Sequence, residues 1–117
     1  KDQLTDSSKC FEKTSFSGAK ADGLLEHIEN LKKKQIILIG LESHICVLQT
    51  ALEFSEKGYE VFVVSDAIAS RKLTSYETAL TRLEQADIWL LNTESVLFEW
   101  IRDAAHPEFK SLSKLIL

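Results

Sequence analysis

The sequence has 117 residues with 14 basic and 18 acidic side chains, so its formal net charge is −4. This length fits one domain, spanning residues 1–117, and 44% apolar with 27% charged residues is typical of a globular protein rather than a disordered one. The negative charge argues against nucleic acid as the main partner. No apolar run approaches the roughly 20 residues needed to cross a bilayer, so we expect no membrane partner.

The two cysteines do not suggest a disulfide framework, and because the N-terminus is polar we expect no signal peptide. These features favour a reduced, cytoplasmic protein. The one basic run, Lys32–Lys34, lies at the end of a predicted helix and is interpreted as a solvated helix end.

The first half of the chain predicts a loop, a helix and a strand. Residues 1–19 are polar and have no regular period, which is typical of a loop. Apolar residues at helical spacing predict a helix over about 22–34. The continuous apolar run at 35–40 predicts a strand buried on both faces, as in parallel sheets.

The same helix–strand unit then repeats. A helix carrying Val47 to Phe54 is expected to end at Gly58, and residues 60–66 form a second buried strand. Thr74 and Glu77 have the spacing of a capping box, which predicts the start of a third helix.

The last part of the chain predicts a third strand at 88–92 and a helix over 94–104. Pro107 is expected in the first turn of a final helix, where its missing N–H costs nothing.

Alternating strands and helices predict an α/β fold, with three layers (α/β/α) around a parallel, Rossmann-like sheet. Such sheets usually have about five or six strands, and two of three parallel strands would be edges. We therefore expect strands to be missing on the N-terminal side, which agrees with the absence of methionine from the sequence. The single domain is predicted to be incomplete at its N-terminus.

Cys46 follows the first predicted strand and lies near the start of the next helix. Ligands of open α/β sheets bind at this end of the strands. Free N–H groups and the helix dipole there favour a thiolate nucleophile and can stabilise an oxyanion. From position alone, the alternative that Cys46 is a small buried apolar residue stays open. Cys10 lies in the polar loop, with no helix start behind it.

Other candidate sites are weaker. Metal-ligand spacing is absent among His27, His44 and His106, so we expect no metal. His44 lies beside the cysteine and is a candidate pocket residue. Gly40 lacks the further glycines of a dinucleotide-binding fingerprint, and no cofactor is expected. Asp66 ends a strand like a phosphoacceptor aspartate, but no lysine follows the third strand to complete such a site.

Several blocks spanning nearly the whole chain are similar to one known family. They are Phe11–Ser17, Gly40–Val47, Gly58–Val61, Val64–Ala67 with Ser70 and Arg71, Asn92–Ser95 and Ala104–Lys110. Together they resemble the C-terminal half of the isochorismatase-like cysteine hydrolases, in particular their small isochorismatase domain-containing branch. The segment Phe11–Ser17 is similar to the loop that carries the active-site lysine of that family.

This resemblance implies an enzyme with Cys46 as nucleophile and Lys13 as the cation beside it. It also implies a cis peptide bond between Leu41 and Glu42, which would aim the backbone N–H groups of Glu42 and Cys46 at a developing oxyanion. The implied reaction is the hydrolysis of a small amide, or a related C–N substrate, through a thioester intermediate. Phe16, in the lysine loop, is a second candidate pocket residue beside His44.

The aspartate that acts as general base in this family has no counterpart here, because it ends a strand of the missing part. Asp66 follows a different strand and is expected to support the loop near Ser70 and Arg71. Two alternatives remain open: a catalytically silent scaffold or oligomerisation protein of the same fold, and a thiol redox protein that uses Cys46.

Besides a small-molecule substrate, the expected partner is a second copy of the chain in a homo-oligomer. The last helices carry more apolar surface than the end of a chain needs; the alternative is that they cover the sheet. The residues concerned are Phe98, Trp100, Ile101, Phe109, Leu112, Leu115 and Ile116.

Overall fold

The computed structural model describes residues 4–116. Its centre is a sheet of three parallel strands in the order β1 (Gln35–Leu41), β2 (Glu60–Ala69) and β3 (Trp89–Leu91). In chain order the helical elements are η1 (Gly18–Lys20, 3-10), α1 (Leu24–Asn30), η2 (Ser43–Val47, π), α2 (Leu48–Glu56), α3 (Leu73–Gln85), α4 (Thr93–Ile101) and α5 (Phe109–Ser113). The predicted parallel α/β fold is confirmed.

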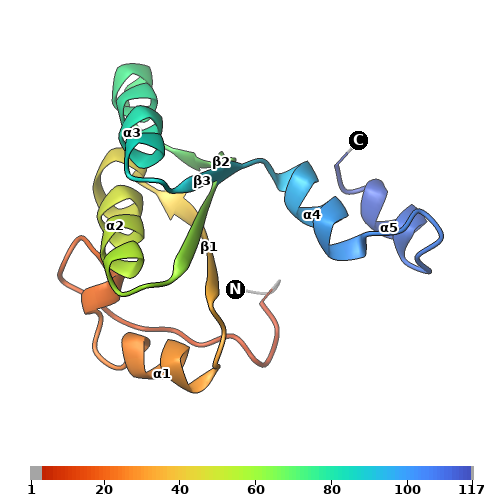
Figure 1. The fold of residues 1–117 in the computed structure, drawn as a ribbon, viewed down its shortest axis with the longest axis horizontal. Coiled ribbons are helices and arrows are strands. Elements are labelled where there is room, and N and C mark those ends of the chain that lie inside the picture. Colours follow the sequence, from red (N-terminus) through yellow and green to blue (C-terminus); the bar gives the residue numbers. More distant parts are fainter. Residues whose placement is uncertain (1–3, 117) are drawn as a thin grey trace.

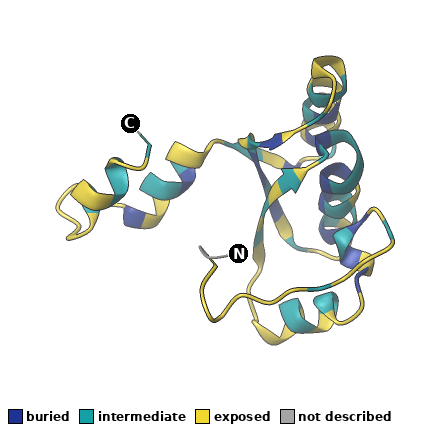
Figure 2. Ribbon diagram, turned by 180° about the vertical axis from the view of Figure 1, so that it is seen from behind, coloured by how far each residue is buried: buried dark blue, intermediate teal, exposed yellow. Residues whose placement is uncertain are grey.

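The core lies between the sheet and the helices α2 and α3, which share one side of it (Figure 1). α2 buries residues at a spacing of three, Leu48, Ala51 and Phe54, and α3 buries Ala79 and Leu83. This spacing places each set on one helical stripe. Val61 and Val63 of β2 complete the contact from the sheet. In Figure 2 the buried residues gather in these two layers.

The second strand is longer than the sequence predicts, ending at Ala69 rather than at residue 66. The register between β1 and β2 shifts, so that Gly40 and Leu41 pair with Ile68 and Ala69. This pairing extends β2 toward the turn that carries Cys46.

The predicted helix over 22–34 is shorter in the structure because α1 ends at Asn30. Lys32 has a positive φ of 52°, which a continuing α-helix does not allow. The Lys32–Lys34 run therefore forms a turn and its exit rather than the last turn of the helix.

The predicted capping box is wrong. α3 begins at Leu73 and its N-cap is Lys72, whose extended backbone precedes the helix without a side-chain cap. Thr74 already lies inside the first turn, where its carbonyl oxygen accepts the Thr78 hydroxyl at 2.7 Å.

The predicted helix ends near the C-terminus also shift. α4 ends at Ile101 rather than at residue 104, because Arg102 adopts a left-handed conformation (φ 63°). Pro107 lies in a turn before the last helix, since α5 begins at Phe109 with Glu108 as its N-cap.

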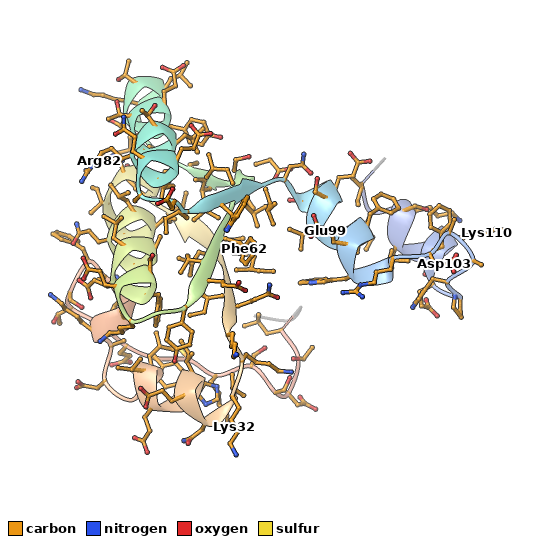
Figure 3. The ribbon with its side chains drawn as sticks, in the orientation of Figure 1. Lys32, Phe62, Arg82, Glu99, Asp103 and Lys110 are labelled. Atoms are coloured by element: carbon orange, nitrogen blue, oxygen red, sulfur yellow. The ribbon has the colours of Figure 1, made fainter. Side chains whose placement is uncertain are left out.

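The expectation that the first strand is buried on both faces is wrong for the described structure. Ile37, Ile39 and Leu41 of β1 are exposed, although intervening residues face the core. Ile37 pairs with Phe62, and Phe62 pairs with Trp89, so one row of large apolar side chains crosses all three strands. The Phe62 and Trp89 rings stack with centroids 6.5 Å apart. We call this row, together with Ile39 two residues after Ile37 in β1, the open face; Phe62 is labelled in Figure 3.

α4 and α5 extend from the other side of the sheet as an arm, along which Glu99, Asp103 and Lys110 are labelled in Figure 3. Val96 and Ile101 are buried there, whereas Trp100 and Leu115 are 70% and 78% exposed. The arm and the open face border an apolar groove of about 450 Å³.

Among residues 4–116, none of the helices is long and apolar enough to span a bilayer.

Candidate active site

The turn that follows β1 carries Cys46. The peptide bond between Leu41 and Glu42 is cis, and the Glu42 carbonyl oxygen accepts hydrogen bonds from the backbone N–H groups of Ile45 (3.1 Å) and Val47 (3.2 Å). The resulting π turn η2 runs directly into α2, and Cys46 is half-buried within it. Cys46 is therefore held in a helical turn at the carboxyl end of the strand.

The loop before η1 brings Lys13 to this cysteine. The Lys13 Nζ lies 3.9 Å from the Cys46 Sγ and donates hydrogen bonds to the carbonyl oxygens of Ser15 (2.9 Å) and Phe16 (3.0 Å). An ammonium group has three N–H donors, so these three contacts use all of them and orient the group. The pairing of Lys13 with Cys46, 33 positions apart, comes from the tertiary fold.

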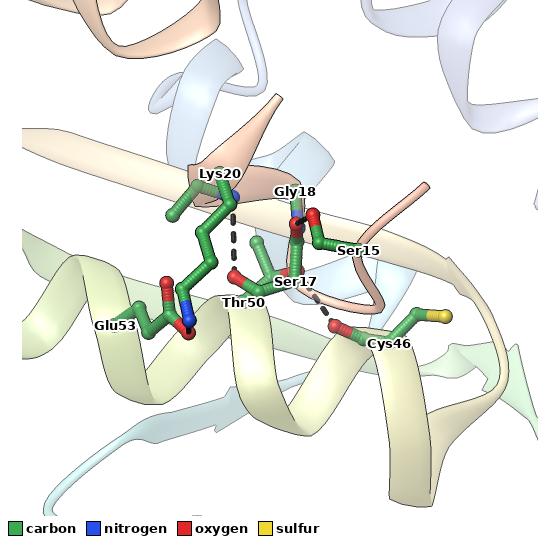
Figure 4. Close-up of polar contacts among 8 residues, drawn as sticks. Ser15, Ser17, Gly18, Lys20, Cys46, Thr50 and Glu53 are labelled. Atoms are coloured by element: carbon green, nitrogen blue, oxygen red, sulfur yellow. Dashed lines mark hydrogen bonds and ion pairs between the residues drawn. The ribbon is translucent and has the colours of Figure 1, made fainter. Parts of the chain in front are cut away.

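The loop that carries Lys13 is attached to α2 at two points (Figure 4). The Thr50 hydroxyl accepts a hydrogen bond from the Gly18 N–H (2.8 Å) and donates one to the Cys46 carbonyl oxygen (2.6 Å). Lys20 and Glu53 form an ion pair at 3.5 Å. The hydroxyl therefore contacts both the lysine loop and the residue that carries the thiol.

On its other side, the turn is attached to the segment after β2. The Glu42 carboxylate accepts hydrogen bonds from the Arg71 backbone N–H and Nε, both at 3.1 Å. The Arg71 backbone N–H above all, with its guanidinium, lowers the pKa of Glu42 below its ordinary value. The His44 Nδ1 lies 2.8 Å from the Ser70 Oγ. Two residues of the turn, Glu42 and His44, thus each form a hydrogen bond with the β2–α3 connection.

Asp66 does not support the loop at Ser70 and Arg71 as the sequence suggested. Its Oδ1 accepts hydrogen bonds from the backbone N–H (2.8 Å) and the hydroxyl (3.0 Å) of Thr93, the first residue of α4. The reason is geometric: Val64 pairs with Leu91, the last residue of β3, so Asp66, two residues further along β2, lies beside the start of α4.

The two candidate pocket residues differ in their surroundings. His44 is half-buried and lines a pocket of about 290 Å³ together with Arg71, Lys72 and Ser75. Phe16 is 61% exposed, and its contribution to the site is its carbonyl oxygen, which accepts from Lys13. Within residues 4–116, no three or more His, Cys, Asp or Glu side chains are grouped as metal ligands would be.

Two contacts of this site did not emerge from the sequence. Thr50 lies four positions after Cys46, one helical turn along. The sequence around it does not distinguish it from a threonine on the surface of any helix. Arg71 was part of a family-like block, but its partner Glu42 is 29 positions away, and no local pattern connects the two.

Known proteins resemble this chain in sequence and in structure. The model of the isochorismatase domain matches residues 1–95. The secreted isochorismatase effector Isc1 of Phytophthora sojae is 41% identical over 109 residues, which cover 92% of this chain and 52% of the effector.

Two solved structures share the fold. The MAR1 ribonuclease of Caenorhabditis elegans superposes with a TM-score of 0.78 at 38% identity, over 89% of this chain and 53% of that protein. The nicotinamidase PncA of Bacillus subtilis superposes with a TM-score of 0.65 at 28% identity, over 69% and 45%. The chain thus spans about half the length of the relatives it matches. Because the domain model matches most of its residues, the chain belongs to the isochorismatase family.

Proposed function

We propose that this chain is the part of a hydrolase that supplies the catalytic thiol. The hydrolase cleaves a small amide, or a related C–N substrate, with Cys46 as the nucleophile. Family membership and the solved nicotinamidase relative support a hydrolase as the class of protein. The observation that carries the proposal is the distance of 3.9 Å between the Lys13 Nζ and the Cys46 Sγ. At that distance a cation attracts the negative charge that a sulfur nucleophile carries.

The proposed reaction is the one that the family resemblance implies. The sulfur bonds to the carbonyl carbon of the substrate, and the carbonyl oxygen becomes an oxyanion, for which the family resemblance makes the N–H groups of Glu42 and Cys46 the donors. The C–N bond then breaks, and the amine departs with the proton that the thiol gave up. Water hydrolyses the thioester, releasing the carboxylic acid and restoring the thiol.

The proton transfers need a base, and the family resemblance makes this base an aspartate. No residue of this sequence matches it. We place it in the part of the relatives' length that this chain does not cover, about half of the Phytophthora protein. The complete protein would then combine that carboxylate with Lys13 and Cys46.

Competing functions make different demands on the same residues. A silent scaffold needs no reactive thiol, and a redox protein needs reversible oxidation of Cys46. The ribonuclease named among the relatives acts on a polyanion, whereas this chain has a formal net charge of −4. We therefore favour a small uncharged or weakly charged substrate over nucleic acid. Separately, the proposal includes a reducing, cytoplasmic location for the protein.

Alkylation with iodoacetamide at neutral pH tests the proposal, because the two cysteines can be compared within one molecule. Cys10 is exposed and Cys46 is half-buried, so accessibility alone would make Cys10 react faster. We expect Cys46 to react faster instead, and we expect Lys13→Met to remove this preference. Preferential reaction of Cys10 in the unaltered chain would rule the nucleophile out.

Turnover is measured on the complete protein with a panel of small primary amides, and with an RNA oligonucleotide as a separate arm. Amide hydrolysis that disappears in Cys46→Ala supports the proposed reaction. Cleavage of RNA alone, or reversible sulfenate formation without turnover, would replace it by one of the competing functions.

A further inference from the structure

We propose that Thr50 is a positioning residue whose hydroxyl holds the lysine loop and the cysteine turn in one fixed relation, so that Lys13 stays beside Cys46. The inference rests on the proposed function, because it concerns the same pair of atoms. The Thr50 hydroxyl bonds to the Gly18 N–H and to the Cys46 carbonyl oxygen, so it acts through the backbone on both sides rather than on the ammonium group or the thiol.

The contacts form a closed ring. Thr50 accepts from the Gly18 N–H, and two residues earlier the Phe16 carbonyl oxygen accepts from the Lys13 Nζ, which in turn contacts the Cys46 Sγ. The Cys46 carbonyl oxygen accepts from the Thr50 hydroxyl and closes the ring. Figure 4 shows Thr50 between Gly18 and Cys46. Opening the ring at the hydroxyl would free the loop relative to the helix.

A threonine that donates to the carbonyl four residues earlier is common in helices and has no special meaning alone. Thr78 makes the same bond to Thr74, at 2.7 Å, on the exposed side of α3. Thr50 differs because its oxygen also accepts from the Gly18 N–H at 2.8 Å, 32 positions away in sequence. A hydroxyl can donate one hydrogen bond and accept others, so both contacts are satisfied together.

Packing supports the same contact. A methyl group added at Gly18 would lie 3.4 Å from both the Cγ2 and the Oγ1 of Thr50, so the loop backbone rests directly against this side chain. Ser17, the neighbouring residue, is only 2% exposed. The other attachment is the Lys20–Glu53 ion pair, in which the Lys20 side chain is 67% exposed. Exposed pairs of this kind contribute little, so most of the constraint comes from Thr50.

The test compares three variants of the chain by the ratio of the Cys46 to the Cys10 alkylation rate. Thr50→Val keeps the shape and removes the hydroxyl, Thr50→Ser keeps the hydroxyl, and Thr78→Val removes the equivalent helical bond away from the site. We expect Thr50→Val to lower the ratio roughly fivefold, which corresponds to the loss of one net hydrogen bond. Thr50→Ser and Thr78→Val should keep the ratio of the unaltered chain.

A second readout separates positioning from folding. Hydrogen exchange of the Gly18 amide should accelerate in Thr50→Val and stay slow in Thr50→Ser, while circular dichroism reports that each variant is folded. A ratio unchanged in Thr50→Val would overturn the positioning role and leave the proposed function intact. A lack of Cys46 preference in the unaltered chain would overturn the proposed function, and the positioning role with it.

Discussion

Glu42 and Arg71 join the cysteine turn to the start of α3, because both the backbone N–H and the Nε of Arg71 donate to one carboxylate oxygen of Glu42 at 3.1 Å. The second carboxylate oxygen lies 3.0 Å from the same Nε. Glu42 is also the residue after the cis peptide bond. A surface ion pair therefore lies at the turn on which the proposed chemistry depends.

Removing the guanidinium by Arg71→Gln should lower stability in a manner that depends on pH. Because the folded-state pKa of Glu42 is below its ordinary value of 4.5, the ionised carboxylate contributes stability above that pH and loses it as the pH falls further. The melting temperatures of the variant and the unaltered chain should differ at pH 6 to 7, and the difference should begin to shrink only as the pH falls below 4.5, toward the lowered folded-state pKa of Glu42. A difference that is constant across this range would mean that Arg71 acts through packing alone. The Arg71 backbone N–H remains in the variant, so we expect a partial effect.

Ser43→Ala should leave stability unchanged or raise it. Ser43 is fully buried, and its hydroxyl has no hydrogen-bond partner among residues 4–116. A buried polar group without a partner costs free energy, so replacing it by a methyl group removes a penalty of about 1–3 kcal/mol at most.

Ser17→Ala is the matched control for this change. Ser17 is equally buried, but its Oγ accepts a hydrogen bond from the Ala19 N–H at 3.2 Å. Thermal or urea unfolding should show a loss for Ser17→Ala alone. A clear loss for Ser43→Ala would indicate that its hydroxyl has a partner outside the described residues.

Tyr76→Phe should reduce the free energy of unfolding by about 0.5–1.5 kcal/mol, the usual net value of a hydrogen bond. The Tyr76 hydroxyl donates to the Ser65 carbonyl oxygen at 2.9 Å and thereby connects α3 to β2. Tyr59→Phe serves as the control, since the Tyr59 ring packs edge-on against Phe54 and its hydroxyl makes no hydrogen bond within residues 4–116. Equal losses in urea titrations of the two variants would contradict the assignment.

The open face should mediate association of the chain with itself when nothing else covers it. Ile39 and Trp89 are 67% and 64% exposed there, and burying one such side chain is worth about 1.5–3 kcal/mol. We expect Ile39→Lys to weaken self-association in sedimentation velocity by roughly tenfold or more. Leu73→Lys changes a comparably exposed leucine at the start of α3, and it should have no effect. Equal behaviour of the two variants would move the interface elsewhere, with the α4–α5 arm as the next region to test.

Much of the fold could be predicted because its signals are local. The apolar runs of β1 and β2 and the one-sided helices α2 and α3 each carry their own periodicity, and parallel α/β topology follows from their order. The position of Cys46 after a strand marked the candidate site for the same reason. The predicted helix ends were wrong where a single backbone conformation ends the helix, as at Lys32 and Arg102. The positive φ angles of these two residues leave no clear sign in the sequence.

The sequence by itself determined the α/β class, the strand-end location of Cys46 and, through resemblance, its partner Lys13. Only the tertiary structure decided that one hydroxyl, Thr50, bonds to both sides of that pair, and that Glu42 rather than Asp66 binds Arg71. The physical reason is the separation along the sequence over which each interaction acts. Periodicity and turn chemistry act over a few neighbouring residues, whereas the Gly18–Thr50, Glu42–Arg71 and Asp66–Thr93 hydrogen bonds join groups 27 to 32 positions apart. Such groups meet only when the chain has folded.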